Sequence, residues 1–179
     1  MYDNQIYQVI IPILTTGLMA QGLSDVTVVQ NNQPTQQGAD LGRTIYLHKL
    51  LNSPYGFPQE IDTWNTINSE MDHISDQWDE AHFQLSTLVT ENPADDSALT
   101  GSDLANIALR ILQSRAAIST LVTARLGILR ISPVPNPFFT NDRDVFQSSA
   151  HFDFVITNND PLTSISPIVN DVQFNIYRV

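Results

Sequence analysis

The sequence of 179 residues contains no cysteine, so neither disulfide bonds nor thiolate metal sites can form. Basic residues are scarce as well, because eight lysines and arginines stand against 19 acidic residues, and Lys49 is the only lysine. Proteins that bind nucleic acid by counterion release need clustered basic side chains, and the sequence has no such cluster. We therefore do not expect sequence-specific DNA binding, but an acidic surface past which DNA slides without sticking is compatible with this charge.

Long apolar runs are missing too. The longest one, from Val9 to Leu14, is interrupted by Pro12, whereas a membrane helix needs about 20 apolar residues. The N-terminus carries Asp3 and no basic segment, so a signal peptide is not expected. We expect a soluble protein without a membrane partner, and the lack of cysteine fits assembly in the cytosol.

Charged residues make up only 15% of the chain, below the usual quarter, and asparagine, glutamine, serine and threonine fill the gap. A polar but sparsely charged surface suits subunit contacts, because charge is depleted in interface cores. The length fits one domain, and no internal repeat or boundary is visible. We therefore expect residues 1–179 to form a single domain.

Hydrophobic periodicity predicts a helix over residues 3–21 that stops at Gly22. Two short strands are predicted at residues 25–30 and 44–51, the second with Ile45, Leu47 and Leu51 on one face. Residues 52–58 contain two prolines and a glycine, which predicts a turn.

The next segment, residues 78–90, alternates in polarity, which predicts a half-buried strand. Its two faces are Phe83, Leu85, Thr87 and Val89 on the apolar side, and Glu80, His82, Gln84 and Ser86 on the polar side. Residues 59–76 have no clear pattern and could extend a neighbouring strand into a long hairpin.

In the second half, Ser102 is the predicted cap of a helix with Leu104, Ile107, Ala108, Ile111 and Leu112 at helical spacing. Further helical turns over residues 115–122 end at Gly127, and strands are predicted at 128–131, at 146–156 and around Val172, Phe174 and Ile176. Prolines exclude a central strand over residues 133–137. The element order indicates an α+β fold, with a single mixed or antiparallel β-sheet packed by two or three helices and an extended hairpin.

Residues that could support catalysis or metal binding form no recognised pattern. Histidines 48, 73, 82 and 151 lack zinc-site spacing, and the acidic residues Asp72, Asp76, Asp79 and Glu80, like Glu91, Asp95 and Asp96, fit solvated strand edges and turns. Ser149, His151 and Asp153 alternate along one strand at about 6–7 Å per step, too far for a catalytic triad. We expect no enzyme activity, cofactor or metal.

The C-terminal half carries a series of short motifs. The series starts at the Ile128-Leu129-Arg130-Ile131 strand, which follows a helix ending at a glycine. It continues through a turn and a strand with the motif residues Asn136, Pro137, Phe138, Phe139, Phe146, Phe152, Asp153 and Phe154. This series resembles bacteriophage tail-terminator and neck proteins, although His151 stands where that group usually has a small residue before the first phenylalanine of the strand. The two-residue spacing of the phenylalanines in this strand predicts that they are core residues.

This resemblance implies a non-enzymatic virion protein that forms a ring of six copies at the head-tail junction, terminates the tail tube and joins it to the neck. Its partners would be itself, the tail tube and sheath proteins and a head-tail connector, with genomic DNA passing through the lumen. The alternative is a head-tail connector or gateway ring of the neck with twelve copies. A small ligand-binding or enzymatic domain would need a pocket with convergent polar groups, and the sequence shows no candidate cluster.

The polar stretch over residues 59–90 is our candidate for the contact between subunits. Its candidate interface residues are Trp64, Trp78, His82 and Gln84. Heterologous contacts of this kind close into a ring when the rotation fits. Deleting residues 60–74 is then expected to leave a folded monomer.

Overall fold

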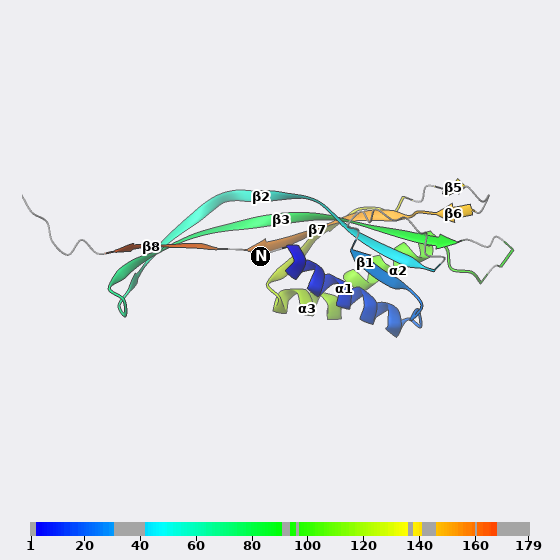
Figure 1. Ribbon diagram of the computed structural model, residues 1–179, viewed down its shortest axis with the longest axis horizontal. Helices are drawn as coiled ribbons and strands as arrows, with labels where there is room; N and C mark the ends of the chain where they lie inside the picture. Colours follow the sequence, from blue (N-terminus) through cyan, green and yellow to red (C-terminus); the bar gives the residue numbers. More distant parts are fainter. Residues whose placement is uncertain are drawn as a thin grey trace, which may run out of the picture.

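A computed structural model describes residues 3–30, 42–90, 94–95, 97–135, 138–140, 146–159 and 161–167. Within this part of the chain, three helices lie against one face of a mixed, open β-sheet (Figure 1). The elements in chain order are α1 (Asp3–Ala20), β1 (Thr27–Gln30), β2 (Thr44–Asn65), β3 (Glu70–Thr90), α2 (Gly101–Leu112), α3 (Arg115–Thr123), β4 (Leu126–Ile131), β5 (Phe138–Thr140), β6 (Phe146–Ser148), β7 (His151–Asn159) and β8 (Leu162–Pro167). The predicted α+β fold is confirmed.

The sheet is organised around β3. Strand β1 pairs in parallel with β2, and β2 pairs antiparallel with the whole length of β3. On the other edge of β3, three strands follow one another: β6 at its C-terminal end, β7 along its middle and β8 along its N-terminal part. Strand β4 continues the sheet beyond β7, and β5 pairs with β6.

The core lies between the helices and the middle of the sheet. The apolar face of α1 and that of α2 pack on β2, β3 and β7, as their periodicity predicted. The largest fully buried side chains are Phe83, Phe152, Phe154, Ile6, Ile10, Leu14, Leu18, Ile45, Leu47, Leu85, Leu104 and Leu112. Gly17 lets α1 approach α2 closely, because a Cβ atom there would lie 2.4 Å from Cγ2 of Ile111.

Beyond the core, the β2–β3 hairpin projects as a long ribbon away from the helices, and β8 runs beside it (Figure 1). We call this ribbon the arm and define it as residues 52–79 together with β8. The arm contributes no residue to the buried core. Residues 59–76 therefore extend the two neighbouring strands into a long hairpin, which their sequence allowed as one possibility. The apolar face predicted for residues 78–90 is buried as expected.

The turn predicted at residues 52–58 is wrong, because β2 continues through it to Asn65. Pro54 lies opposite Asp79, and Pro58 falls in a register shift between Tyr55 and Gln59. In the described part of the sheet, β1 covers the outer edge of β2 only up to Leu47, and proline is tolerated on such an edge or at a bulge. A similar shift between Lys49 and Leu51 reverses the alternation and leaves Leu51 52% exposed instead of on the buried face.

Three further local predictions are corrected. The cap of α2 is Thr100 rather than Ser102, which lies inside the helix. Helix α3 ends at Thr123, and Arg125 with a φ of 57° makes the turn, so Gly127 belongs to β4 instead of stopping the helix. The predicted strand over residues 146–156 is split into β6 and β7. The backbone breaks at Ala150, whose carbonyl accepts from the backbone N–H of Thr87. The strand predicted around Val172 lies outside the described residues.

Candidate assembly surfaces

The arm carries large apolar side chains that nothing in the described chain covers. Phe57 is 97% exposed, and Ile67, in the turn between β2 and β3, is 91% exposed. Two of the predicted interface residues, Trp64 and Trp78, are 46% and 51% exposed. Exposed apolar groups of this size on one projecting element are typical of a contact surface.

The four predicted interface residues do not form one patch. Trp78, His82 and Gln84 alternate along the same face of β3, opposite to the core, and His82 and Gln84 are half-buried. Trp64 pairs with Met71, whose position in β3 places both on the other face. The role of these residues in subunit contact stays a prediction, and only three of them share a face.

Charge is segregated between the arm and the segment from α2 to β4. Residues 52–79 contain six acidic side chains (Glu60, Asp62, Glu70, Asp72, Asp76 and Asp79) and neither lysine nor arginine. The segment from α2 to β4, residues 101–131, contains Arg110, Arg115, Arg125 and Arg130 against a single acidic residue, Asp103. The chain as a whole carries a formal charge of -11, so this local excess of arginine stands out from its surroundings.

The tip of the arm is held by hydrogen bonds. The side-chain oxygen Oδ1 of Asn65 accepts from the backbone N–H of Ile67 at 3.1 Å and from that of Asn68 at 3.3 Å. The Asn68 side chain donates to Oε1 of Glu70 at 2.9 Å, and Ser69 adopts a left-handed φ of 54°. These bonds fix the turn that presents Ile67.

A row of polar side chains crosses the arm and was missed by sequence reasoning. Nδ1 of His73 lies 2.7 Å from Oδ1 of Asp62, and its Nε2 lies 2.9 Å from Oγ of Ser166. With the proton on Nδ1, His73 donates to Asp62 and accepts from the Ser166 hydroxyl. The three residues come from β2, β3 and β8, and only the strand register brings them together.

These residue types and distances match a serine–histidine–aspartate triad, but the surroundings do not match an active site. A triad works with a bound acyl group and with N–H donors aimed at a developing oxyanion. None of the three residues lines either groove described below, and the side chains of His73 and Asp62 are 38% and 61% exposed. The row instead links β8 to the hairpin.

The alternating set Ser149, His151 and Asp153 is not assembled into a triad. Nδ1 of His151 lies 3.4 Å from the backbone oxygen of Ser149, and Asp153 accepts from the side chain of Gln84 at 3.0 Å. Within the described residues, no group of three or more histidine and acidic side chains is placed to hold a metal ion. Of the acidic patch, Asp72 accepts from the Asn65 side chain at 3.2 Å.

The residues of the family-like motif are structural where they are described. Phe152 and Phe154 are buried, and the Phe154 ring stacks on Phe83 with centroids 5.5 Å apart. Asp153 alternates to the exposed side of β7. Strand β5 contains Phe138 and Phe139, and β6 contains Phe146; the structure describes only the backbone of these three residues. The turn residues Asn136 and Pro137 lie outside the described residues.

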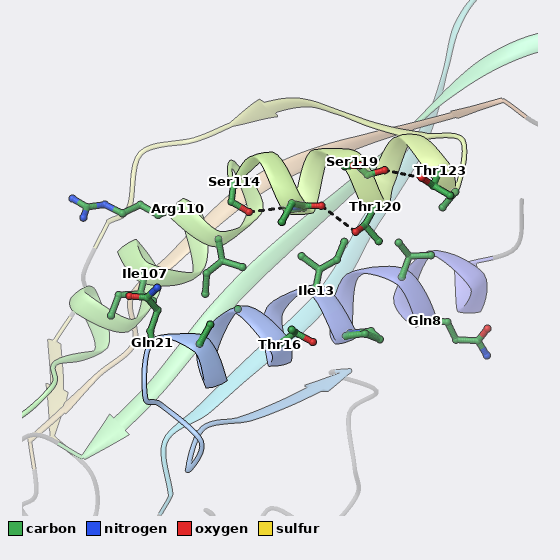
Figure 2. A pocket seen from close by; sticks show the side chains of 18 residues that line it. Gln8, Ile13, Thr16, Gln21, Ile107, Arg110, Ser114, Ser119, Thr120 and Thr123 are labelled. Carbon is green, nitrogen blue, oxygen red and sulfur yellow. Dashed lines mark hydrogen bonds between the residues drawn. The ribbon is translucent and has the colours of Figure 1, made fainter.

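A groove of about 920 Å³ runs between α1 and α3 on the outer side of the helical layer (Figure 2). Its walls are apolar or small side chains, among them Val9, Ile13 and Gly17 from α1 and Ala117 and Ala124 from the α3 region. Arg110 lies at one end of it and Gln8 at the other. No acidic side chain is among the described residues that line the groove.

A smaller groove of about 540 Å³ lies where the arm leaves the body. It is lined by β3, by the α3–β4 connection and by the residues that link β7 to β8. Two of its lining residues, Asp76 and Asn159, have a buried side-chain oxygen without a hydrogen-bond partner in the described part of the chain. No described helix is long and apolar enough to cross a membrane.

Comparison with known proteins gives one family. No curated protein matches the chain. Residues 5–168 match the family described as E217 gateway protein gp29, a range that runs from α1 to the end of β8 and so includes both the arm and the helical layer. This match supports a bacteriophage neck protein and favours the gateway reading over the tail terminator, for which it gives no confirmation. The chain therefore belongs to the E217 gateway protein gp29 family, a family of structural bacteriophage neck proteins.

Proposed function

We propose that the chain is a subunit of a gateway ring at the head-tail junction of a bacteriophage particle. The observation that carries this proposal is the family match over residues 5–168. The ring contains copies of this chain alone and encloses a lumen through which the genomic DNA passes. In the virion it lies between a head-tail connector on one side and proteins of the tail tube and sheath on the other.

The charge of the chain supports the passage of DNA without retention. A formal charge of -11 repels the phosphate backbone, and only eight basic residues are available to hold it. A lumen lined by such subunits favours sliding over binding. The ring therefore acts as a structural passage and needs no sequence-specific contact.

The shape of the chain supports a ring of heterologous contacts. The acidic arm and the segment from α2 to β4, which has an excess of arginine, lie on different parts of one molecule (Figure 1). Complementary surfaces that are separated in this way join copies head to tail, and such contacts close into a ring when the rotation fits. The terminator reading remains the second candidate, because the motif residues from Ile128 to Phe154 resemble that group.

The mass of the purified protein in solution tests the proposal, followed by negative-stain imaging of every large species. A closed ring of twelve copies is the expected result for a gateway protein, whereas a ring of six would favour the function of a tail terminator. If the protein stays monomeric, the same imaging is repeated with isolated tails and connectors. A chain that remains monomeric and joins neither would overturn the proposal.

A further inference from the structure

We propose that the tip of one subunit's arm, with Ile67 as its apolar anchor, binds in the groove between α1 and α3 of the next subunit. The occupant of the groove is thus a second copy of this chain. The inference rests on the proposed ring, because it names the contact that joins neighbouring copies. Four observations support it: the groove, the tip, their charges and the reach of the arm.

The groove offers an apolar binding surface that is not covered by the described part of the chain. Its walls come from α1, α2 and α3, whose other faces bury the core, and its lining includes Val9, Pro12 and Ile13 from α1. A volume of about 920 Å³ exceeds that of a single isoleucine side chain and accommodates a whole turn. The chain's own tip does not reach this groove, because the arm points away from the helices (Figure 1).

The tip offers a preformed knob. Ile67 is 91% exposed although it is one of the most apolar residue types. The turn that presents it is fixed by the two bonds to Asn65 and by the bond from Asn68 to Glu70. A turn that is ordered before binding loses little conformational freedom on binding, so more of the contact energy appears as affinity.

The charges of the two surfaces are complementary. Glu70 closes the turn at the tip, and the five other acidic residues of the arm follow it along the ribbon. Arg110 is the charged residue among the described side chains that line the groove, and it is exposed at one end (Figure 2). With Ile67 seated in the groove, Glu70 of one copy and Arg110 of the next form the pair that sets the orientation of the arm.

The arm is long enough to reach a neighbour. At about 3.3 Å per residue, the extended stretch from Asn52 to Asn65 spans roughly 40 Å. This exceeds the roughly 10 Å diameter of a helix and the roughly 10 Å between packed layers. A knob at one end of the molecule and a groove elsewhere on it form a heterologous contact, so an open row of copies keeps one free knob at one end and one free groove at the other until the ring closes.

Cysteine pairing between copies tests this contact directly, because the chain has no cysteine of its own. One variant carries Thr66→Cys in the tip and a second, of different mass, carries Thr16→Cys in the groove wall. After mixing and mild oxidation, we expect at least tenfold more disulfide-linked mixed dimer than in a matched mixture of Thr66→Cys with Leu129→Cys. Leu129 is exposed on β4 and does not line the groove.

Charge reversal provides a second, independent measurement. We expect Arg110→Glu and Glu70→Arg each to lower the fraction of protein in rings at least tenfold, and the double variant to recover most of it. Arg130→Glu, which changes the same charge outside the groove, serves as the control and keeps the rings. Circular dichroism establishes that each variant is folded.

The outcomes separate this inference from the proposed function. Rings that form equally well with Arg110→Glu and with Glu70→Arg, and that give no excess of mixed dimer, would overturn the inference and leave the ring function standing. Wild-type protein that forms no ring and joins neither tails nor connectors would overturn the proposed function and the inference with it. Excess mixed dimer together with recovery in the double variant would support the inference.

Discussion

Tyr7 shows at the scale of one residue how the core constrains ionisation. Its ring is buried and meets Phe83 edge to face, with centroids 5.4 Å apart. Burial raises the pKa of Tyr7 above its ordinary value of 10.0, although hydrogen bonds from the Lys49 backbone and the Gln30 side chain lower it. The folded protein therefore keeps a proton that the unfolded chain loses as the pH rises through about 10.

This difference predicts a loss of stability in alkali. Because the folded state holds more protons than the unfolded state above pH 10, the free energy of unfolding falls as the pH rises through that region. We expect Tyr7→Phe to make this fall less steep, as measured by urea unfolding between pH 8 and pH 11. Tyr55→Phe is the matched control, since Tyr55 is exposed on the arm. Equal slopes in the two variants would contradict the role of Tyr7.

His73 illustrates a second residue-scale effect, the fastening of β8. Because His73 bonds to both Asp62 and Ser166, we expect His73→Ala to speed amide hydrogen exchange across β8 several-fold while exchange in β7 stays unchanged. Ser164→Ala is the control, because Ser164 lies opposite His73 in the strand register, whereas the described side-chain bond of His73 to this strand goes to Ser166. Equal protection of β8 in both variants would show that the row does not hold this strand.

The same residues give a direct check on the triad-like geometry. We expect Ser166 to remain unlabelled by a fluorophosphonate that reacts with activated serines, because Ser166 lines neither of the two grooves formed by the described residues. Labelling that disappears in His73→Ala would mean that the row activates Ser166 and would contradict its purely structural role.

At the scale of elements, the start of α2 depends on one threonine. The Thr100 hydroxyl accepts from the backbone N–H of Asp103, and the Asp103 carboxylate accepts in return from the Thr100 backbone. Such a capping box satisfies two helix-end donors. We therefore expect Thr100→Ala to lower the free energy of unfolding by about 1 kcal/mol, measured by urea denaturation. Ser102→Ala, at the second residue of the helix, is the control, and an equal loss there would assign the cap to Ser102 instead.

Elements with a strong local pattern could be predicted from the sequence. The periodicity of α1 and the alternation of Phe83 and Leu85 in β3 reflect a buried face that local spacing encodes. The course of β2 past Pro54 could not be predicted, because it depends on a free sheet edge and a register shift that only the pairing with β3 defines. Local propensity favoured a turn there, and tertiary pairing overrode it.

The candidate surfaces were predictable only in part for the same reason. The stretch that forms the arm could be singled out as polar and available for contacts, but Asp62, His73 and Ser166 meet across sequence separations of 11 and 93 residues. No spacing rule covers such a set. The groove between α1 and α3 depends on the packing of three helices, because α2 also lines it, and its lining residues such as Thr16 and Thr120 have no distinguishing pattern in the sequence.

At the scale of the whole molecule, segregated charge should make assembly sensitive to salt. The Debye length falls from about 10 Å at 0.1 M salt to about 3 Å at 1 M, so exposed opposite charges attract one another much less at high salt. We expect the fraction of protein in rings to fall several-fold between 0.1 M and 1 M sodium chloride, measured by light scattering. The double variant with Arg110→Glu and Glu70→Arg should follow the same curve, and ring formation that is independent of salt would contradict an electrostatic contribution.

The arm itself is the element whose loss should separate folding from assembly. Residues 60–74 contribute nothing to the buried core, and Gln59 already lies opposite Asp76 in the hairpin. Replacing residues 60–75 by an Asn-Gly turn closes the hairpin between Gln59 and Asp76 with a turn suited to two antiparallel strands. Strand β8 loses its partners in this variant, but the core elements α1, α2, β3 and β7 keep theirs.

We therefore expect the deletion variant to be a folded monomer. Far-ultraviolet circular dichroism should show the helices, urea unfolding should remain cooperative, and light scattering should give the mass of one chain. Asn106→Ala, an exposed substitution on α2 outside the groove, is the control that should still assemble. A deletion variant that forms complete rings would show that the arm is dispensable for subunit contact, and a variant that does not fold would show that the arm belongs to the folding unit. Since both results differ from the expected monomer, the measurement decides whether the arm serves assembly alone.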